Sequence, residues 1–299
     1  MRIAVTGSSG LIGTALRQRL QSSGHEIVRI VRRDPGPGEI RWDPAACIID
    51  TDALAGIDAV VNLAGAGIGN KRWTDAYKRE IRESRTKSTN LIAEAIASVD
   101  DGPRVLLSAS GVHYYGDRGG EDVDESSTPG TGYLPEVVQA WEASTATAAA
   151  AGVRVVVMRN GVVLSALGGA LKEQLWLFKL GLGGRVGGGH QWQSWITIDD
   201  EVAAIEHLLA ADVTGPVNMV SPNPVTNRDF AGTLARVLKR PAFLPIPAWG
   251  PKLVFGSELV ETLLLQSQKA RPGVLLDSGF RFAHEHLEPG LRAVLDRPL

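Results

Sequence analysis

The chain has 299 residues, of which 44% are hydrophobic and 21% are charged, and its formal net charge at pH 7 is −2. That length is enough for a sizeable core, in one large domain or in two unequal lobes. The near-neutral charge gives no reason to expect nucleic acid or an anionic membrane as a partner. No apolar stretch approaches the ~18 residues of a membrane helix and no secretory leader is visible, so we expect a cytoplasmic globular protein.

The cysteine and histidine content predicts neither a disulfide nor a metal site. Cys47 is the only cysteine, which fits a reducing compartment, and we expect it to be a small buried apolar residue. Among the six histidines, His284 and His286 lie close together but have no further ligand-type residues around them. A surface loop is therefore favoured over a metal site there.

The first 160 residues alternate strand-like and helix-like segments, which is typical of an α/β protein with a doubly wound parallel sheet. The strand candidates are short, nearly continuous apolar runs, as expected of strands that are buried on both faces. The expected strands are Ile3–Val5, Glu26–Val31, Asp58–Asn62, Arg104–Ser108 and Arg154–Arg159. The expected helices are Leu11–Ser23, Thr74–Ser98, Glu136–Ala151 and, further along the chain, Asp199–Ala211.

The regular alternation weakens after Gly161. Residues 181–189 hold six glycines, which predicts a loop whose backbone can approach a ligand closely, and prolines divide the C-terminal part. We therefore expect a Rossmann-type domain formed by residues 1–165 together with about 192–213. A smaller substrate-binding lobe would be built from residues 166–191 and 214–299.

A glycine-rich segment, Thr6-Gly7-Ser8-Ser9-Gly10-Leu11-Ile12-Gly13, directly follows the first strand and opens the first helix. In that context each glycine has a role. Gly7 permits the tight turn, Gly10 lets a pyrophosphate approach the backbone, and Gly13 lets the helix pack close to the sheet. The helix N-terminus offers unpaired N–H groups to phosphates. The segment therefore predicts a dinucleotide site.

The end of the second strand favours NADP(H) over NAD(H). NAD-binding units place an Asp or Glu there to accept hydrogen bonds from the adenosine ribose. Here the strand ends on Val31, and Arg32 and Arg33 follow before the first carboxylate, Asp34. Guanidinium groups at this point suit a 2′-phosphate.

Motifs at the expected strand ends resemble those of the extended short-chain dehydrogenase/reductase superfamily. They are TGSSGLIG at 6–13, Asn62-Leu63-Ala64-Gly65, Ser108-Ala109-Ser110 and Tyr115-Gly116. Within that superfamily, the chain is similar over nearly its whole length to the NADP-binding "epimerase family" of sugar-nucleotide-epimerase-like proteins. This closer similarity is carried by Trp42-Asp43-Pro44, Glu83-Ser84-Arg85, residues 188–196, residues 222–227 and the tail from Pro241 to Leu299.

The resemblance implies a cofactor site and a substrate site along one edge of the sheet. The implied cofactor-binding residues are Gly7, Ser8, Ser9, Gly10, Leu11, Ile12, Gly13, Arg32, Arg33, Asn62, Leu63, Ala64, Gly65, Arg85 and Ser108. The implied substrate contacts are Tyr115, Gln191, Trp192 and Trp195, whose aromatic rings suit stacking on a sugar or a base. The two tryptophans could equally belong to the core of the smaller lobe, and Arg85 could be a solvated helix residue.

The superfamily's chemistry uses a serine, a tyrosine and a lysine four residues after the tyrosine. Ser110 and Tyr133 match the first two, but position 137 is Val, and no lysine lies between Lys87 and Lys172. Without that lysine, a phenol with an ordinary pKa near ~10 is a poor base at neutral pH.

Several hypotheses follow from this departure. Tyr133 could act with help from the nicotinamide or from an arginine such as Arg159, or Tyr114 or Tyr115 could act instead. The favoured function is then an NADP(H)-dependent oxidoreductase or epimerase acting on a small hydroxyl- or carbonyl-bearing molecule, with a compound similar to a sugar nucleotide as one candidate. The alternative is a non-catalytic NADP(H)-binding sensor. Monomer and homodimer both stay open.

Overall fold

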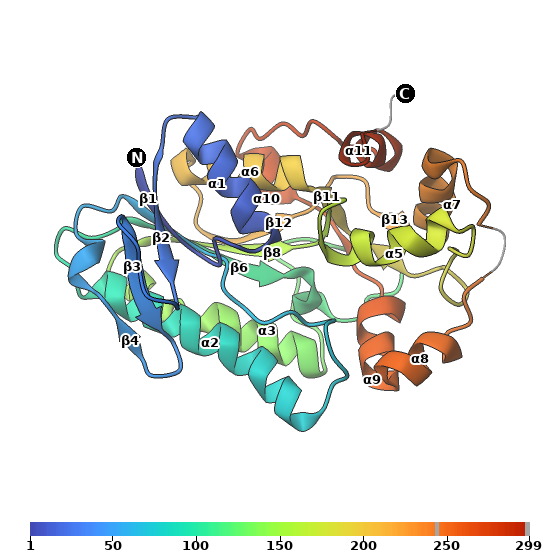
Figure 1. Ribbon diagram of the computed structural model, residues 1–299, viewed down its shortest axis with the longest axis horizontal. Helices are drawn as coiled ribbons and strands as arrows, with labels where there is room; N and C mark the ends of the chain where they lie inside the picture. The colour runs from blue at the N-terminus through green and yellow to red at the C-terminus, as the bar shows by residue number, and fades with distance from the viewer. Residues whose placement is uncertain (243–244, 297–299) are drawn as a thin grey trace.

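The computed structural model describes residues 1–242 and 245–296. Its centre is an eight-stranded sheet in the order β12-β8-β6-β5-β1-β2-β3-β4, in which every neighbouring pair is parallel except β3 and β4 (Figure 1). The strands are β1 (Arg2–Thr6), β2 (Glu26–Val31), β3 (Glu39–Asp43), β4 (Ile48–Ile49), β5 (Ala59–Asn62), β6 (Val105–Gly111), β8 (Arg154–Asn160) and β12 (Gly215–Met219).

Helices cover both faces of the sheet, as the buried strands require. The helices α1 (Leu11–Ser22), α6 (Ile198–Ala210) and α10 (Gly273–Asp277) lie on one face (Figure 1). The other face carries α2 (Asp75–Ala97), α3 (Tyr133–Ala143) and α4 (Ala146–Ala150). The fold is therefore the doubly wound Rossmann-type sheet that the strand–helix alternation predicts.

Two local features differ from the expected elements. The expected helix at Glu136–Ala151 is divided into α3 and α4, because the Ser144 and Thr145 hydroxyls donate to the carbonyls of Ala140 and Glu142 where the helix breaks. The strands β3 and β4 form a hairpin that the alternation did not predict. Cys47 lies in its turn at φ 55° and is exposed, so the expectation of a buried cysteine was wrong.

The smaller lobe is built from short elements around α5 (Gly169–Lys179) and α7 (Asn227–Leu238). Two two-stranded sheets join it to the main domain: β10 (Trp192–Gln193) with β13 (Val225–Thr226), and β7 (Asp122–Val123) with β14 (Lys269–Ala270). A third, β9 (Val162–Leu164) with β11 (Trp195–Thr197), pairs two segments of the main domain. The lobe also contains α8 (Trp249–Phe255), α9 (Ser257–Val260) and α11 (Leu287–Val294). The expected tail motif at 241–299 includes residues 243–244 and 297–299, which lie outside the described residues.

The C-terminal segment does not stay within the smaller lobe. The strand β12 pairs with β8 in the main sheet, so the expected boundary at residue 214 places an edge strand of the sheet in the wrong lobe. The buried side chains of Leu275, Phe280 and Phe282 pack in the same apolar cluster as β1, α1 and α6. One continuous core therefore includes residues from both ends of the chain.

Candidate functional site

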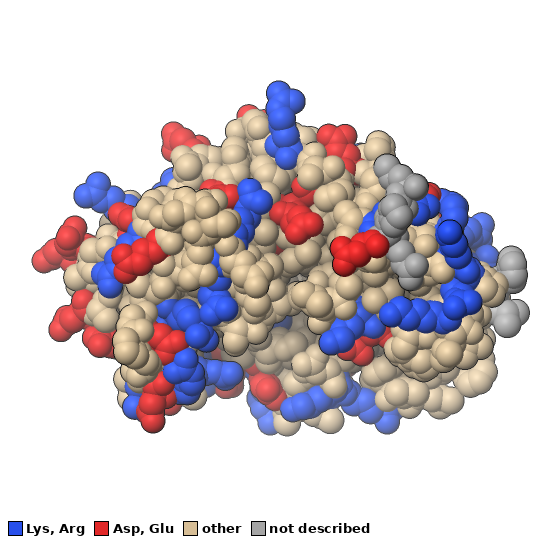
Figure 2. All heavy atoms as spheres, turned by 45° about the horizontal axis from the view of Figure 1, so that its top comes forward, with Lys and Arg blue, Asp and Glu red and all other residues tan. Residues whose placement is uncertain are grey.

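A cleft of about 1310 Å³ runs along the edge where β1, β2 and β5 end. Its walls come from the loop after β1, the ends of β2 and β3, the loop after β5, and one side of α2. On the face seen in Figure 2, acidic and basic side chains are interspersed over the N-terminal half, and the middle of the face is hollowed. A cleft at the carboxyl ends of parallel strands, where the strand order reverses, is the usual ligand site of such sheets.

The glycine-rich loop forms one wall of the cleft through Gly7, Ser8, Ser9 and Gly10. Gly7 has φ +62°, and a Cβ there would lie 2.6 Å from the Leu63 carbonyl oxygen. A Cβ on Gly13 would lie 2.3 Å from the Gly7 oxygen. Gly10 caps α1 without a side-chain hydrogen bond, so the N–H groups of the first turn stay available to a ligand.

Asn62 and Ser108 lie beneath this edge rather than on it. Both side chains are buried, and Asn62 Nδ2 donates to Thr89 Oγ1 at 2.9 Å and to Ser108 Oγ at 3.4 Å. Thr6 Oγ1 donates to Asn62 Oδ1 and accepts from the backbone N–H groups of Leu63 and Ala64. These side chains fix the loop of Leu63, Ala64 and Gly65 that lines the cleft, so the direct cofactor contacts expected of Asn62 and Ser108 are not what the geometry provides.

The far end of the cleft is basic, as expected, but the arrangement involves more residues than Arg32 and Arg33. Both line the cleft, and so does Arg29 from within β2, which donates to Ser8 Oγ at 3.3 Å. Glu39 pairs with Arg33 at 2.7 Å and with Arg29 at 3.1 Å. The hydrogen bond from Arg33 lowers the pKa of Glu39, which keeps this carboxylate ionised between the two guanidinium groups.

Arg29 was not predicted to line the cleft, because the strand Glu26–Val31 was treated as one apolar segment. A charged residue inside an otherwise apolar buried strand is itself an indication of a functional position. Trp42, Asp43 and Pro44 also line this end of the cleft. In the sequence these three residues only indicated the family. Their place in the cleft could not be predicted, because the strand β3 that positions them was not predicted.

Ser110 is held away from the cleft by a buried polar network. Its hydroxyl donates to Glu142 Oε1 at 2.7 Å, and Arg159 binds both oxygens of the same carboxylate at 2.8 and 2.9 Å. Arg159 also donates to the Tyr115 hydroxyl, which donates to Asn218 Oδ1. Ser110 and Tyr115 are 5% and 0% exposed and are not among the residues that line the cleft, so their roles at a substrate stay predictions.

Tyr133 begins α3, as expected, but its hydroxyl donates to the backbone carbonyl of Lys78 at 2.6 Å. The Lys78 ammonium lies over its ring, and Trp73 packs edge-on against it. Burial raises the pKa of Tyr133 to about 12, although the Arg85 charge opposes this shift. The phenol is therefore a neutral donor throughout the physiological pH range and not a base.

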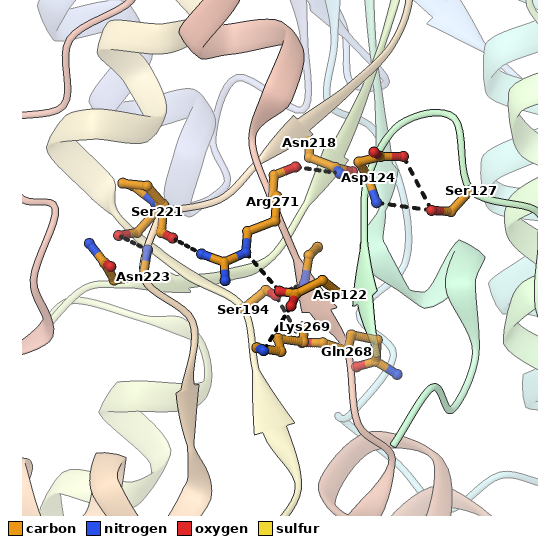
Figure 3. Close-up of polar contacts among 12 residues, drawn as sticks. Asp122, Asp124, Ser127, Ser194, Asn218, Ser221, Asn223, Gln268, Lys269 and Arg271 are labelled. Carbon is orange, nitrogen blue, oxygen red and sulfur yellow. Dashed lines mark hydrogen bonds and ion pairs between the residues drawn. The ribbon is translucent and has the colours of Figure 1, made fainter. Parts of the chain in front are cut away.

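The other expected substrate contacts divide between core and surface. Trp195 is fully buried and donates to the Asn223 carbonyl, and Gln191 is 9% exposed and donates to the Leu264 carbonyl, so neither reaches a cleft. Trp192 is partly exposed beneath the Lys269 ammonium. Figure 3 shows how Lys269 and Arg271 of the C-terminal segment converge on Asp122, with ion pairs of 2.9 and 2.8 Å that hold β14 on β7.

Arg85, which the resemblance implies as a cofactor contact, extends from the middle of α2 and is not among the residues that line the cleft. Its guanidinium lies against Gly65, close enough that a Cβ there would be 3.5 Å from Cζ. His113, in the turn Val112–Tyr115 that follows β6, lies near enough for the Arg85 charge to affect its pKa. Sequence reasoning did not single out His113.

The described part of the chain holds neither a membrane-spanning helix nor a cluster of metal-binding side chains. No helix there is long and apolar enough to cross a membrane. In the same residues, no group of three or more His, Cys, Asp or Glu side chains is placed to hold a metal ion.

Comparisons with known proteins agree with the fold. Residues 3–221 match the NAD dependent epimerase/dehydratase family, and residues 246–294 match a domain of unknown function. An epimerase family protein of Mycobacterium bovis is 41% identical over 99% of this chain and 98% of its own length. The crystal structure of human epimerase family protein SDR39U1 with NADPH is 36% identical, has a TM-score of 0.90 and covers 99% of both chains.

A nucleoside-diphosphate sugar epimerase from Corynebacterium glutamicum is also similar in structure. It is 37% identical with a TM-score of 0.81, and the match covers 99% of this chain but 58% of that one. The family model spans well over half of the chain, and the relatives match it from end to end. The chain therefore belongs to the NAD dependent epimerase/dehydratase family, among the epimerase family proteins of the extended short-chain dehydrogenase/reductase superfamily.

Proposed function

We propose that this protein binds NADP(H) in the cleft and acts as an oxidoreductase or epimerase on a small hydroxyl- or carbonyl-bearing molecule. The observation that carries the proposal is the layout of the cleft. A glycine cradle and an uncapped helix N-terminus lie on its wall, arginines lie at one end, and the Leu63–Gly65 loop lies beside the ends of β5 and β6. The NADPH found in the human relative supports the same cofactor here.

The residues present fit such a dinucleotide. Gly7 and Gly13 let the backbone of the glycine-rich loop pack against the loop after β5 and against α1, where a Cβ would clash with backbone atoms. The first turn of α1 presents N–H groups to a pyrophosphate. Arg29, Arg32 and Arg33 line the same end of the cleft, and they are the residues that would hold a 2′-phosphate. Of these, Arg32 has no protein partner among the described residues, whereas Glu39 orients the other two.

When bound, the nicotinamide exchanges a hydride with a carbonyl or carbinol carbon, and the protein must then manage one proton on the neighbouring oxygen. Tyr133 is a candidate for this role at the edge of the site. Its high pKa means that it would act as an acid in the reducing direction. To do so, its hydroxyl must exchange the Lys78 carbonyl for the substrate oxygen.

Cofactor preference provides the direct test. Charge-assisted hydrogen bonds are worth ~1.5–3 kcal/mol each, so NADPH should bind at least about tenfold more tightly than NADH at low salt. Replacing Arg32 and Arg33 together by Ala should weaken NADPH binding and leave NADH binding nearly unchanged, as measured by calorimetric titration. Arg41→Ala is the matched control, because Arg41 is an exposed arginine on β3 that does not line the cleft. Equal wild-type affinities for the two cofactors would refute the assignment.

A second candidate function, a non-catalytic NADP(H)-binding sensor, is favoured by a specific observation. Val137 stands where the superfamily's lysine would be, Ser110 is bound to Glu142, and the Tyr133 hydroxyl is bound to a backbone carbonyl. The two functions differ in turnover. A broad panel of carbonyl compounds and sugar nucleotides that supports no NADPH oxidation, in a protein that binds NADPH tightly, would favour the sensor.

A further inference from the structure

Arg85 is a partly buried cation that has no counter-ion among the residues that the structure describes. Its guanidinium lies between Gly65 and the ring of Trp141, whose centroid is 5.0 Å from Cζ. Nη1 donates to the Ile81 carbonyl at 2.9 Å. In the described residues, neither Asp nor Glu forms an ion pair with Arg85, and the ionisable groups that favour its charge are the phenols of Tyr133 and Tyr77.

Such a group costs free energy unless an acceptor reaches it. Burial lowers the pKa of Arg85 to about 10, so the guanidinium is still charged at neutral pH although it is poorly solvated. The Nε and Nη2 hydrogens form one planar edge, and among the described residues that edge donates to no protein oxygen. A charged donor edge left open beside a cleft is suited to an anionic ligand.

His113 supplies a second polar group nearby. Its ring makes no hydrogen bond with the described residues, and it lies next to Gly111 at the end of β6. Burial and the Arg85 charge lower the pKa of His113 to about 4, so the imidazole is neutral at pH 7. A neutral imidazole has one N–H donor and one nitrogen acceptor, and can therefore bind a carbonyl or a hydroxyl without adding charge.

We propose that Arg85 and His113 recognise the substrate, and that this substrate is a small carboxylate with a carbonyl or hydroxyl next to the carboxyl group. Arg85 binds the carboxylate through its open edge, and His113 binds the neighbouring oxygen. Arg85 extends from α2 and lies beside Gly65, and His113 extends from the turn after β6 and lies beside Gly111, close enough for the Arg85 charge to act on its ring. This inference rests on the proposed function, in which NADP(H) occupies the cleft that Gly65 lines.

The chemistry favours a carboxylate over a phosphate. The two oxygens of a carboxylate match the paired N–H groups of a guanidinium edge. One negative charge balances one guanidinium, whereas a phosphate dianion would leave a charge uncompensated in a partly buried site.

The test uses oxamate, an unreactive monoanion in which a carboxylate is joined to an amide carbonyl, with inorganic phosphate as the competing anion. Calorimetric titrations would measure both anions on the full-length protein, with saturating NADP⁺ and without cofactor. Oxamate should bind the wild type more tightly than phosphate. Arg85→Gln should raise the oxamate Kd at least tenfold and change the NADPH Kd less than threefold. Arg82→Gln, an exposed arginine on the same helix, is the control and should change neither.

His113→Phe gives an independent measurement if Arg85→Gln does not fold, because it keeps a ring and removes both nitrogens. It should raise the oxamate Kd by about two- to tenfold, which corresponds to one neutral hydrogen bond. The inference would be overturned if oxamate did not bind the wild type, if it bound Arg85→Gln equally well, or if it bound more weakly than phosphate. It would also be overturned if the Arg85→Gln variant lost NADPH binding instead of oxamate binding. Failure of NADPH to bind would refute the proposed function separately, because the oxamate titration without cofactor still reports on Arg85.

Discussion

At the residue scale, Tyr133 distinguishes an enzyme from a sensor. If it protonates the substrate, Tyr133→Phe should lower turnover on a substrate found in the panel by ~10²–10⁴-fold and leave NADPH affinity nearly intact. The lost hydrogen bond to Lys78 should cost only about 1 kcal/mol of stability. Because burial raises the pKa of Tyr133 to about 12, the acid form persists at neutral and moderately alkaline pH, and wild-type reduction should not decline there through this group.

Tyr114→Phe is the matched comparison, because Tyr114 stacks under Arg159 through its ring rather than through its hydroxyl. Single-turnover oxidation of NADPH would measure both variants. A Tyr133→Phe protein as fast as the wild type, together with a slow Tyr114→Phe protein, would move the acid to Tyr114.

Glu201 makes a separate prediction about stability. Its side chain is fully buried at the start of α6, one carboxylate oxygen has no partner in the described residues, and desolvation raises its pKa to about 8. Since the folded pKa lies above the ordinary value of 4.5, the neutral form stabilises the fold below pH 4.5. That stabilisation declines as the pH rises toward 8.

Glu201→Gln should therefore raise the free energy of unfolding by on the order of a few kcal/mol at pH 8 and have little effect at pH 4.5. Urea titrations at the two pH values would measure it. Glu206 lies on the same helix as Glu201 and forms a partly exposed pair with Arg19 of α1. Glu206→Gln breaks this pair and should change stability by less than about 1 kcal/mol. A Glu201→Gln gain that is equal at both pH values would show that the effect is not one of ionisation.

At the scale of elements, the glycine of the first helix makes a steric prediction. A Cβ on Gly13 would lie 2.3 Å from the Gly7 oxygen, so Gly13→Ala must displace α1 or the loop. It should destabilise the protein by about 1–3 kcal/mol and weaken NADPH binding, because the N–H groups of the first turn move with the loop.

Gly232→Ala in α7 is the matched control, because it also adds a methyl group to a helical glycine. Nothing lies within 4 Å of its Cβ position, so the change should stabilise the protein by about 0.5–1 kcal/mol. Thermal unfolding and calorimetric titration of the two variants would check the prediction. Equal effects would mean that the close approach of α1 to the loop is not a constraint.

The accuracy with which the sequence predicts secondary structure differs from one strand or helix to the next. The strands β1, β2, β5, β6 and β8 could be predicted because they are apolar on both faces, and α1 because glycines define both of its ends. The strand β3 was missed because exposed Glu39 and Arg41 alternate with buried Ile40 and Trp42, and β4 has only two residues. Ser110 and Tyr133 occupy the expected positions, but their partners, Glu142 and the Lys78 carbonyl, come from helices whose packing no local pattern specifies.

At the scale of the whole molecule, one hydrophobic core includes side chains from both of the regions that match separate protein families, residues 3–221 and residues 246–294. Phe280 is 8% exposed and packs edge-on against Phe282 at 4.9 Å, within the cluster that includes β1 and α6. Phe280→Ala should therefore cost about 3–5 kcal/mol of global stability, although residue 280 lies far beyond the matched dinucleotide region.

Urea unfolding followed by tryptophan fluorescence and by circular dichroism should show one shared transition that Phe280→Ala shifts as a unit. Leu276→Ala is the control, because Leu276 is 47% exposed on the neighbouring α10, and it should cost less than about 1 kcal/mol. Two separate transitions, with only the second shifted, would show that the lobes fold independently.

The two margins of the large sheet bear on how copies of this protein can associate. The edge strand at each margin of a β-sheet has unpaired backbone N–H and C=O groups, which can pair with a strand from another chain. One margin here is β4, which has only two residues, and the other is β12, in which Pro216 lacks an N–H group to donate. Neither margin offers a long row of free donors and acceptors, so any self-assembly of the folded protein should use helix or loop surfaces rather than a sheet that continues from one molecule into the next.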